Sequence, residues 1–192
     1  CRPACGRTIL RQGDPHEISG TGARVGALCE SRSIRRWLAL ESGPVTQPIQ
    51  NGYLLIADIS GFTSFIADTE LDHAQAIIQQ VLDGLLRNLT PTMNFCEVEG
   101  DAVFVYGLAE QVSRGELIAE LIESTYAGFR DQQRTMIRNA TCPCQACRAI
   151  SGLDLKFVVH YGEFVLQELA GKTGPVGSSV NLVHALLKNR VG

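Results

Sequence analysis

The chain has 192 residues, of which 45% are hydrophobic and 19% are charged, and its formal net charge at pH 7 is −3. These values are typical of a globular protein with one domain and a core of its own. No apolar stretch approaches the ~20 residues that cross a bilayer. Residues 51–192 carry 16 acids against ten bases, which argues against a nucleic-acid surface. We therefore expect a cytoplasmic protein that binds neither membrane nor nucleic acid.

Residues 1–49 differ from the rest of the chain. They contain seven arginines, four acids, a single aromatic residue (Trp37) and no sustained hydrophobic period. Such a segment buries too little apolar surface to fold by itself. We expect a poorly ordered or foreign N-terminal arm and linker, followed by a domain at residues 51–192. Because the chain begins with Cys1 and its only methionines are Met93 and Met136, we also expect it to be a fragment.

Hydrophobic patterns predict the elements of the domain in chain order. The unbroken apolar run after Asn51 predicts a buried strand at residues 53–59. Apolar side chains at spacings of three and four predict a helix at residues 71–89. The other predicted elements are strands at residues 94–98, 102–106, 153–161 and 164–169, a helix capped by Ser113 that reaches about residue 138, a glycine-rich loop at 171–178 and a closing helix at 180–188. This order predicts an α+β fold, a ferredoxin-like α/β sandwich with a mixed, mostly antiparallel sheet and helices on one face.

Two aspartates stand at the ends of predicted strands. Asp58 follows the first apolar run, and Asp101 lies in the hairpin turn 99-EGDA-102. If this hairpin pairs beside the first strand, the two carboxylates meet at one edge of the sheet. They could then bind Mg²⁺ or Mn²⁺, which prefer oxygen ligands and can neutralise a leaving pyrophosphate. Alternatively, Asp58 caps a turn and Asp101 serves only the hairpin geometry.

The turn after Asp58 is a candidate phosphate-binding backbone. Gly61 has no side chain and lets a ligand approach closely. The start of a helical turn also presents N–H groups to anions. The residues expected to contact phosphate in this way are Ile59, Ser60, Gly61 and Phe62.

Three of the seven cysteines lie in one short stretch, 142-CPCQAC-147. The thiolates of Cys142, Cys144 and Cys147 could bind one Zn²⁺, with a fourth ligand from elsewhere in the chain or from solvent. The alternatives are an inert reduced loop and a redox-active dithiol. His73 is interpreted as a surface residue.

Three motifs occur in a characteristic order: 57-ADISGFT-63, 98-VEGDA-102 and 177-GSSVNL-182. Together they resemble the signature of class III nucleotidyl cyclases over residues 51 to about 190. The resemblance is greatest to an uncharacterised branch, a domain of unknown function with a CxCxxC loop before the fourth strand. It implies a homodimer that converts ATP or GTP into a 3′,5′-cyclic nucleotide at the dimer interface. Because class III domains usually continue with further strands, it also implies a C-terminal truncation.

The resemblance assigns roles to individual residues. Asp58 and Asp101 match the two metal-binding aspartates, and Asn181 matches the asparagine that orients the ribose. Glu97 matches the glutamate with which guanylyl cyclases recognise guanine, which favours GTP. Ala185 stands where the family has the arginine that stabilises the transition-state phosphate. A further base-selecting position falls on Gly174, which indicates neither base.

Two functions remain open from the sequence. The first is a metal-dependent adenylate or guanylate cyclase. The second is a regulatory module that binds nucleotide and metal without useful turnover. Ala185 favours the second, since an arginine acting on phosphoryl transfer can contribute ~10³–10⁵ to the rate. A diguanylate cyclase is a third hypothesis, because 99-EGDAV-103 only half matches the GGDEF motif of that related fold.

Overall fold

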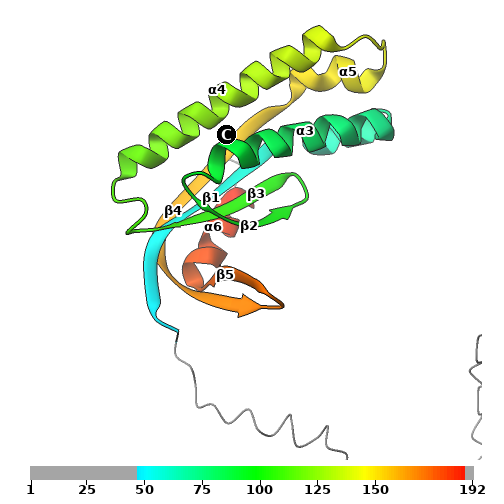
Figure 1. The fold of residues 1–192 in the computed structure, drawn as a ribbon. Helices are drawn as coiled ribbons and strands as arrows, with labels where there is room; N and C mark the ends of the chain where they lie inside the picture. Colours follow the sequence, from blue (N-terminus) through cyan, green and yellow to red (C-terminus); the bar gives the residue numbers. More distant parts are fainter. Residues whose placement is uncertain (1–46, 189–192) are drawn as a thin grey trace, which may run out of the picture. The chain divides into compact units, whose positions relative to one another are not determined.

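The computed structural model describes residues 47–188, so the predicted arm at residues 1–49 lies outside the described residues except for its last three. Figure 1 shows the elements, coloured along the chain. In chain order they are β1 (Ile49–Ser60), α2 (Phe62–Asp68), α3 (Leu71–Leu89), β2 (Asn94–Glu99), β3 (Ala102–Leu108), α4 (Gly115–Asn139), α5 (Gln145–Ala149), the 3₁₀ helix η1 (Ile150–Gly152), β4 (Asp154–Leu169), β5 (Lys172–Val176) and α6 (Ser178–Lys188). Among the described residues, none of the helices combines the length and the hydrophobicity that a membrane-spanning segment requires.

The strands form one sheet in the order β2-β3-β1-β4-β5. Every neighbouring pair is antiparallel, so the described sheet is antiparallel throughout rather than mixed. The α+β class is confirmed. The central strand β1 pairs with β3 on one side and β4 on the other, which places Asp58 opposite both Ala102 and Lys156.

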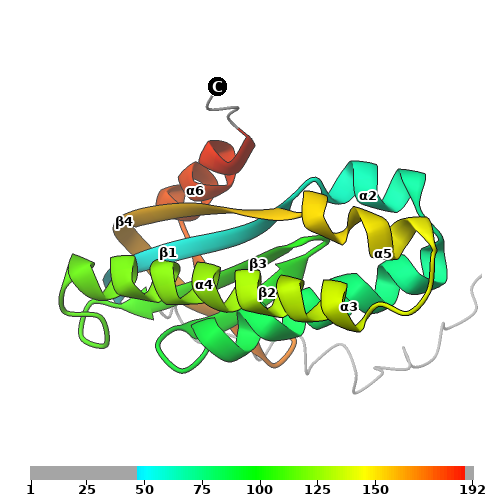
Figure 2. The same cartoon turned by 90° about the horizontal axis from the view of Figure 1, so that it is seen from above.

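Side chains of β1 alternate between the two faces of the sheet, as the pleat of a strand requires. Leu55, Ala57 and Ile59 belong to the larger core cluster, which packs under α3 and α4. Leu54 and Ile56 belong to a second cluster on the other face, which includes Val183 of α6. Figure 2 shows α3 and α4 on one side of the sheet and α6 on the other. The predicted helix-covered face is therefore the one under α3 and α4, and α6 covers part of the opposite face.

The C-terminal strands differ from their predicted form. The two strands expected at residues 153–161 and 164–169 are one strand, β4, which runs straight through Gly162. A Cβ at Gly162 would overlap the hydroxyl of Ser179, so this glycine allows α6 to approach β4 and does not make a turn. The expected loop at 171–178 contains β5, and the turn before it uses positive φ at Ala170 (53°) and Gly171 (77°).

Three helices also differ from the sequence expectation. The helix α4 begins at Gly115 after Arg114 and has no side-chain cap, so the predicted cap at Ser113 is wrong. The short helices α2 and α5 were not predicted as helices. Both are stabilised by tertiary packing, because each buries one side chain, Phe65 in α2 and Ala146 in α5.

Candidate functional site

The two predicted metal-binding aspartates lie side by side at one end of the sheet. Pairing of β1 with β3 puts Asp58 opposite Ala102, the residue after Asp101. The backbone N–H of Ile59 donates to the backbone oxygen of Asp101 at 3.2 Å, which holds the hairpin turn against the end of β1. The hairpin therefore pairs beside the first strand, which is the condition that the sequence-based hypothesis required.

The two carboxylates are partly withdrawn from water. Burial is the main cause that raises the pKa of Asp58, the charge of Asp101 raises it further, and Lys156 opposes both. Burial also raises the pKa of Asp101. The protein thus holds two mutually repelling negative charges in a half-buried position, where a bound cation would relieve the repulsion.

Lys156 is a residue of this site that the sequence analysis missed. It lies on β4 opposite Asp58, and its Nζ donates to the backbone oxygen of Leu187, near the end of α6, at 2.7 Å. The only local signal was a lysine within the otherwise apolar run 155-LKFVV-159. Its partner on β1 became evident only from the strand pairing.

Replacing Asp58 with asparagine is expected to raise the thermal stability of the protein at pH 7. A carboxyl group whose pKa is raised by folding stabilises the protein below its unfolded pKa and loses this effect as pH rises through the folded pKa. At pH 7 the charged Asp58 therefore costs stability, and asparagine removes that cost. Thermal unfolding without added Mg²⁺ should show a higher Tm for the variant at pH 7 and a smaller difference near pH 4. The matched control is Asp83→Asn on the exposed face of α3; a lower Tm for Asp58→Asn at pH 7 would contradict the electrostatic argument.

The turn after Asp58 has a backbone conformation that favours glycine at position 61. Gly61 has φ of 88°, a left-handed conformation that favours glycine, and its oxygen accepts the N–H of Phe65 as α2 begins. Of the four predicted phosphate contacts, Ile59 already uses its N–H on Asp101, and Ser60 is paired with Asp154 at the end of the sheet. Gly61 and Phe62 follow the sheet and remain the predicted phosphate contacts.

The predicted base-recognition position lies elsewhere, on the edge strand β2. Glu97 is exposed and follows a bulge in the pairing of β2 with β3. A Cβ at Gly174 would stand 3.3 Å from the Sγ of Cys96, the residue before Glu97. The two positions that the resemblance associated with the base therefore lie close together. Burial raises the pKa of Cys96 to about 11, so its thiol is neutral and able to donate a hydrogen bond at neutral pH.

The predicted ribose-orienting residue lies on α6. Asn181 and Ala185 are both exposed and, four residues apart, share one face of this helix. Between them, His184 faces the sheet, with its Nδ1 3.5 Å from Oε2 of Glu99 and its ring 5.1 Å from that of Phe104. The hydrogen bonds found within residues 47–188 do not join Asn181 or Glu97 to either aspartate. Glu97 lies on β2, which is separated from β1 by β3, and Asn181 lies on α6.

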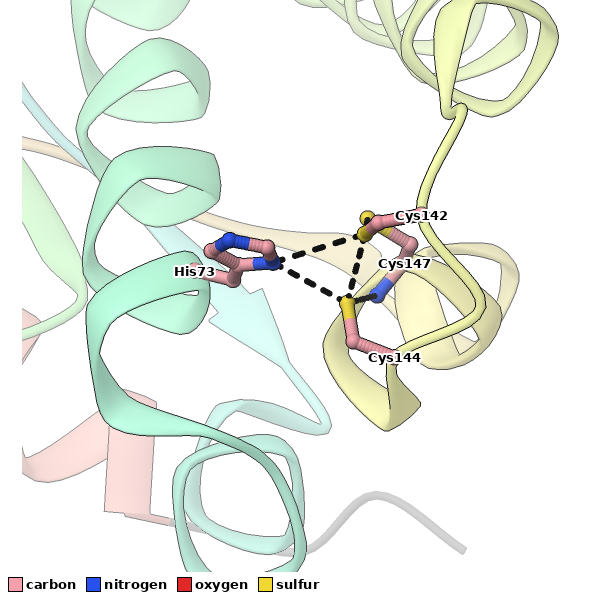
Figure 3. Close-up of side chains that lie close together, drawn as sticks. All are labelled: His73, Cys142, Cys144 and Cys147. Carbon is pink, nitrogen blue, oxygen red and sulfur yellow. Dashed lines mark hydrogen bonds between the residues drawn. The ribbon is translucent and has the colours of Figure 1, made fainter.

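A second cluster of reactive side chains forms where the cysteine loop meets α3. His73 projects from the first turn of α3 toward Cys142, Cys144 and Cys147 (Figure 3). The His73 Nδ1 lies 3.1 Å from the Sγ of Cys144 and 3.4 Å from that of Cys142. The four ligand atoms all lie within 4.8 Å of one another, so the group could hold a metal ion. His73 is exposed, as expected, and it is also a member of this cluster, which nothing in the local sequence around it indicated.

Comparison with known proteins connects this chain to a family and to a fold. The model of a family described as "Protein of unknown function (DUF2652)" matches residues 78–192. The uncharacterized protein Rv2561/Rv2562 of Mycobacterium tuberculosis is 30% identical over 99 residues, which are 52% of this chain and 46% of that protein. The chain thus spans about half the length of the curated relative that it matches.

Several solved structures are similar in fold. A bacterial light-regulated adenylyl cyclase superposes with a TM-score of 0.56 at 13% identity, covering 75% of this chain and 73% of that chain. The guanylyl cyclase Cya2 gives 0.54 at 16%, covering 72% and 70%. A class III adenylyl cyclase-like ATP-binding protein from Pseudomonas aeruginosa gives 0.53 at 17%, covering 71% and 31%. These similarities show that the described domain has the class III nucleotidyl cyclase fold.

Proposed function

The chain belongs to the DUF2652 family of proteins of unknown function, and we propose that its cyclase-fold domain binds a nucleoside triphosphate through Mg²⁺ or Mn²⁺ held by Asp58 and Asp101. The observation that carries this proposal is the apposition of the two half-buried carboxylates by the pairing of β1 with β3. Magnesium typically takes one or two carboxylates and completes its coordination with water and substrate phosphates. The aspartate pair would supply the carboxylate ligands that the protein contributes to such a site.

The turn at Gly61 and the charge of Lys156 are placed where they could interact with the phosphates of the same ligand. The turn at Gly61 leads into α2 at Phe62, and the first N–H groups of this helix have no side-chain cap. Lys156 adds a positive charge on the strand next to Asp58. A triphosphate would thus meet two carboxylates through the cation and a nearby lysine through its own charge.

The nucleotide base is proposed to lie against β2, with GTP preferred. Glu97 offers a carboxylate acceptor on an exposed strand. The neutral thiol of Cys96, next to Gly174, offers a donor beside it. Guanine presents two adjacent N–H donors, at N1 and N2, to a single carboxylate, whereas adenine presents only its amino group, so the carboxylate of Glu97 matches guanine better than adenine.

A homodimer would complete the site. Glu97 lies on β2, two strands away from the β1 strand that carries Asp58, Asn181 lies on α6, and both residues are exposed. We therefore assign the metal to the aspartates of one subunit, and the base and ribose to the other. In such a composite site the ribose 3′-hydroxyl attacks the α-phosphorus, a new O–P bond forms, the bond to pyrophosphate breaks and the hydroxyl proton passes to solvent. The bound cations would offset the charge of the leaving pyrophosphate.

A second candidate function is nucleotide binding without turnover. Ala185 supports it, because no guanidinium stands four residues after Asn181 on α6. The similar Pseudomonas aeruginosa protein carries the description "adenylyl cyclase-like ATP-binding protein", which fits such a role. Both candidates require the aspartate pair, and they differ only in whether a cyclic product forms.

Metal-dependent binding of a slowly hydrolysed GTP analogue is the expected result for the purified protein. Calorimetry in Mg²⁺ should detect binding, and Asp101→Ala should weaken it by about 100-fold or more, since even residues that only support metal ligands cost 10–100-fold in metal affinity. Asp83→Ala, an exposed carboxylate on α3, should bind like the wild type. Equal binding with and without Mg²⁺, or undiminished binding by Asp101→Ala, would overturn the proposed function.

A further inference from the structure

Side chains from the cysteine loop and from the first turn of α3 form a second cluster, separate from the aspartate pair (Figure 3). We propose that His73, Cys142, Cys144 and Cys147 bind one Zn²⁺ as a closed structural site, which fixes α5 and η1 against the turn that begins α2. The metal site itself does not depend on the proposed nucleotide binding.

The donor set matches zinc in type and number. Three thiolates and one imidazole are a common structural zinc set, and with all four positions taken by protein no place remains for a reacting water. The Sγ of Cys142 lies 3.0 Å from that of Cys144 and 3.1 Å from that of Cys147. Zn–S bonds of ~2.3 Å in a tetrahedron separate sulfurs by about 3.7 Å. Binding therefore needs these close sulfur pairs to move apart by several tenths of an ångström, and any pair of ligand atoms near the 4.8 Å limit to move closer.

Hydrogen bonds also hold the cysteine loop in a conformation in which its sulfur atoms lie close together. The backbone N–H of Cys147 points to the Sγ of Cys144 at 3.4 Å, a contact that stabilises a thiolate. The carboxylate of Glu70, just before α3, accepts the backbone N–H groups of Gln145 (3.2 Å) and Ala146 (3.1 Å). Residues that precede and begin α3 thus hold the loop through Glu70 and complete the ligand set through His73.

This arrangement favours a metal over the other two interpretations of the cysteines. A redox-active dithiol needs two sulfurs, and an inert loop needs no fourth group. Here an imidazole from a helix about 70 residues earlier in the chain lies with its Nδ1 near two of the thiols. Convergence of four soft or borderline donors from two separate elements is the pattern that a structural metal site requires.

Metal binding at this site is expected to order the turn at Gly61, which lies near the aspartates. Ala146 and Ile150 are 0% and 1% exposed, so α5 and η1 are anchored in the main core. At the end of η1 the backbone oxygen of Gly152 lies so close to Gly61 that a Cβ there would stand 3.0 Å from it. Figure 2 shows α2 and α5 next to each other at this end. A metal that orders α5 should therefore also order the turn at Gly61.

Metal content provides the direct test of the site. Protein purified under reducing conditions should contain one zinc per chain by elemental analysis, and His73→Ala and Cys144→Ser should lose most of it. Cys96→Ser, which changes a thiol on β2, should retain one zinc. Cobalt substituted for zinc should show the absorption of a tetrahedral thiolate site. His73→Cys should keep one metal with a changed cobalt spectrum, which distinguishes a lost ligand from a misfolded variant. A metal-free reduced protein, a disulfide detected by mass, or full zinc in both ligand variants would overturn the proposal.

Hydrogen exchange tests the coupling to the turn without any nucleotide. Removal of zinc with a chelator should speed exchange in residues 61–68 and 145–153, and leave β1 and β3 unchanged. Faster exchange confined to residues 142–149 would refute the coupling while the metal site stands. Because neither readout uses GTP, failure here leaves the proposed function untouched, and failure of GTP binding leaves the metal site untouched.

Discussion

Replacing Ala185 with arginine is expected to increase cyclic GTP formation by about 10²-fold or more. A preorganised donor aimed at charge that develops in the transition state typically contributes 10²–10³ in rate, and an arginine in phosphoryl transfer ~10³–10⁵. In this chain the position that the resemblance assigns to that arginine carries a methyl group. The substitution would restore the missing positive charge.

The structure indicates that the longer side chain can be accommodated. Ala185 is exposed on α6, so an arginine there displaces no core residue. It shares a face of the helix with Asn181, the proposed ribose contact. The guanidinium would then extend from the same surface that faces the nucleotide in the proposed homodimer.

The measurement is the product formed from GTP and Mn²⁺, quantified by mass spectrometry for the full chain. Ala185→Gln is the matched control, because it adds length without charge and should not increase the rate. Adding Asp58→Ala to Ala185→Arg should abolish the product. If Ala185→Arg binds the GTP analogue normally and still forms no cyclic product, the binding-module function is favoured over the cyclase.

Replacing Gly52 with alanine should destabilise the folded domain strongly. Gly52 is buried in β1, and a Cβ there would overlap the backbone oxygen of Gly107 on β3. Backbone on one side and β4 on the other leave little freedom to relax. Forcing atoms into a packed site costs about 3 kcal/mol at the upper end of the usual range. At ~2–4 °C per kcal/mol, the Tm should fall by roughly 6–12 °C.

The control for Gly52→Ala is Gly152→Ala. A Cβ at Gly152 would have no heavy atom within 4 Å, so this substitution should leave the Tm nearly unchanged. Thermal unfolding of both variants followed by circular dichroism measures the difference. A Gly52→Ala protein with the Tm of the wild type would show that β1 and β3 separate more easily than the described contact implies.

Patterns along the chain were sufficient where the deciding interactions are local. The spacing of apolar residues predicted the helix at residues 71–89 with its observed bounds, because that spacing marks the face buried against the sheet. The apolar run after Asn51 predicted the central strand, although pairing on both sides extends it to Ile49–Ser60. Glycine misled where its role is spatial: Gly162 suggested a break between strands, whereas it allows Ser179 to pack against β4.

The aspartate pair was predictable because a hairpin usually packs beside its neighbouring strand, and both carboxylates stand at strand ends that this pairing brings together. The residues that surround the two aspartates were not predictable from the sequence. Lys156 reaches Asp58 only because β4, almost 100 residues away, pairs with β1. The burial that raises the pKa of both aspartates also arises only when the chain is folded.

The sequence by itself determined the periodic elements, the α+β class, the motifs shared with the class III cyclases and the three clustered thiols. Each of these depends on residues that are near in the chain, where side-chain periodicity and motif spacing carry the information. The tertiary structure alone decided which groups meet: His73 with the cysteines, Lys156 with Asp58, and η1 with the turn at Gly61. The physical reason is that contacts between distant segments depend on sheet pairing and core packing, which leave no regular spacing in the sequence.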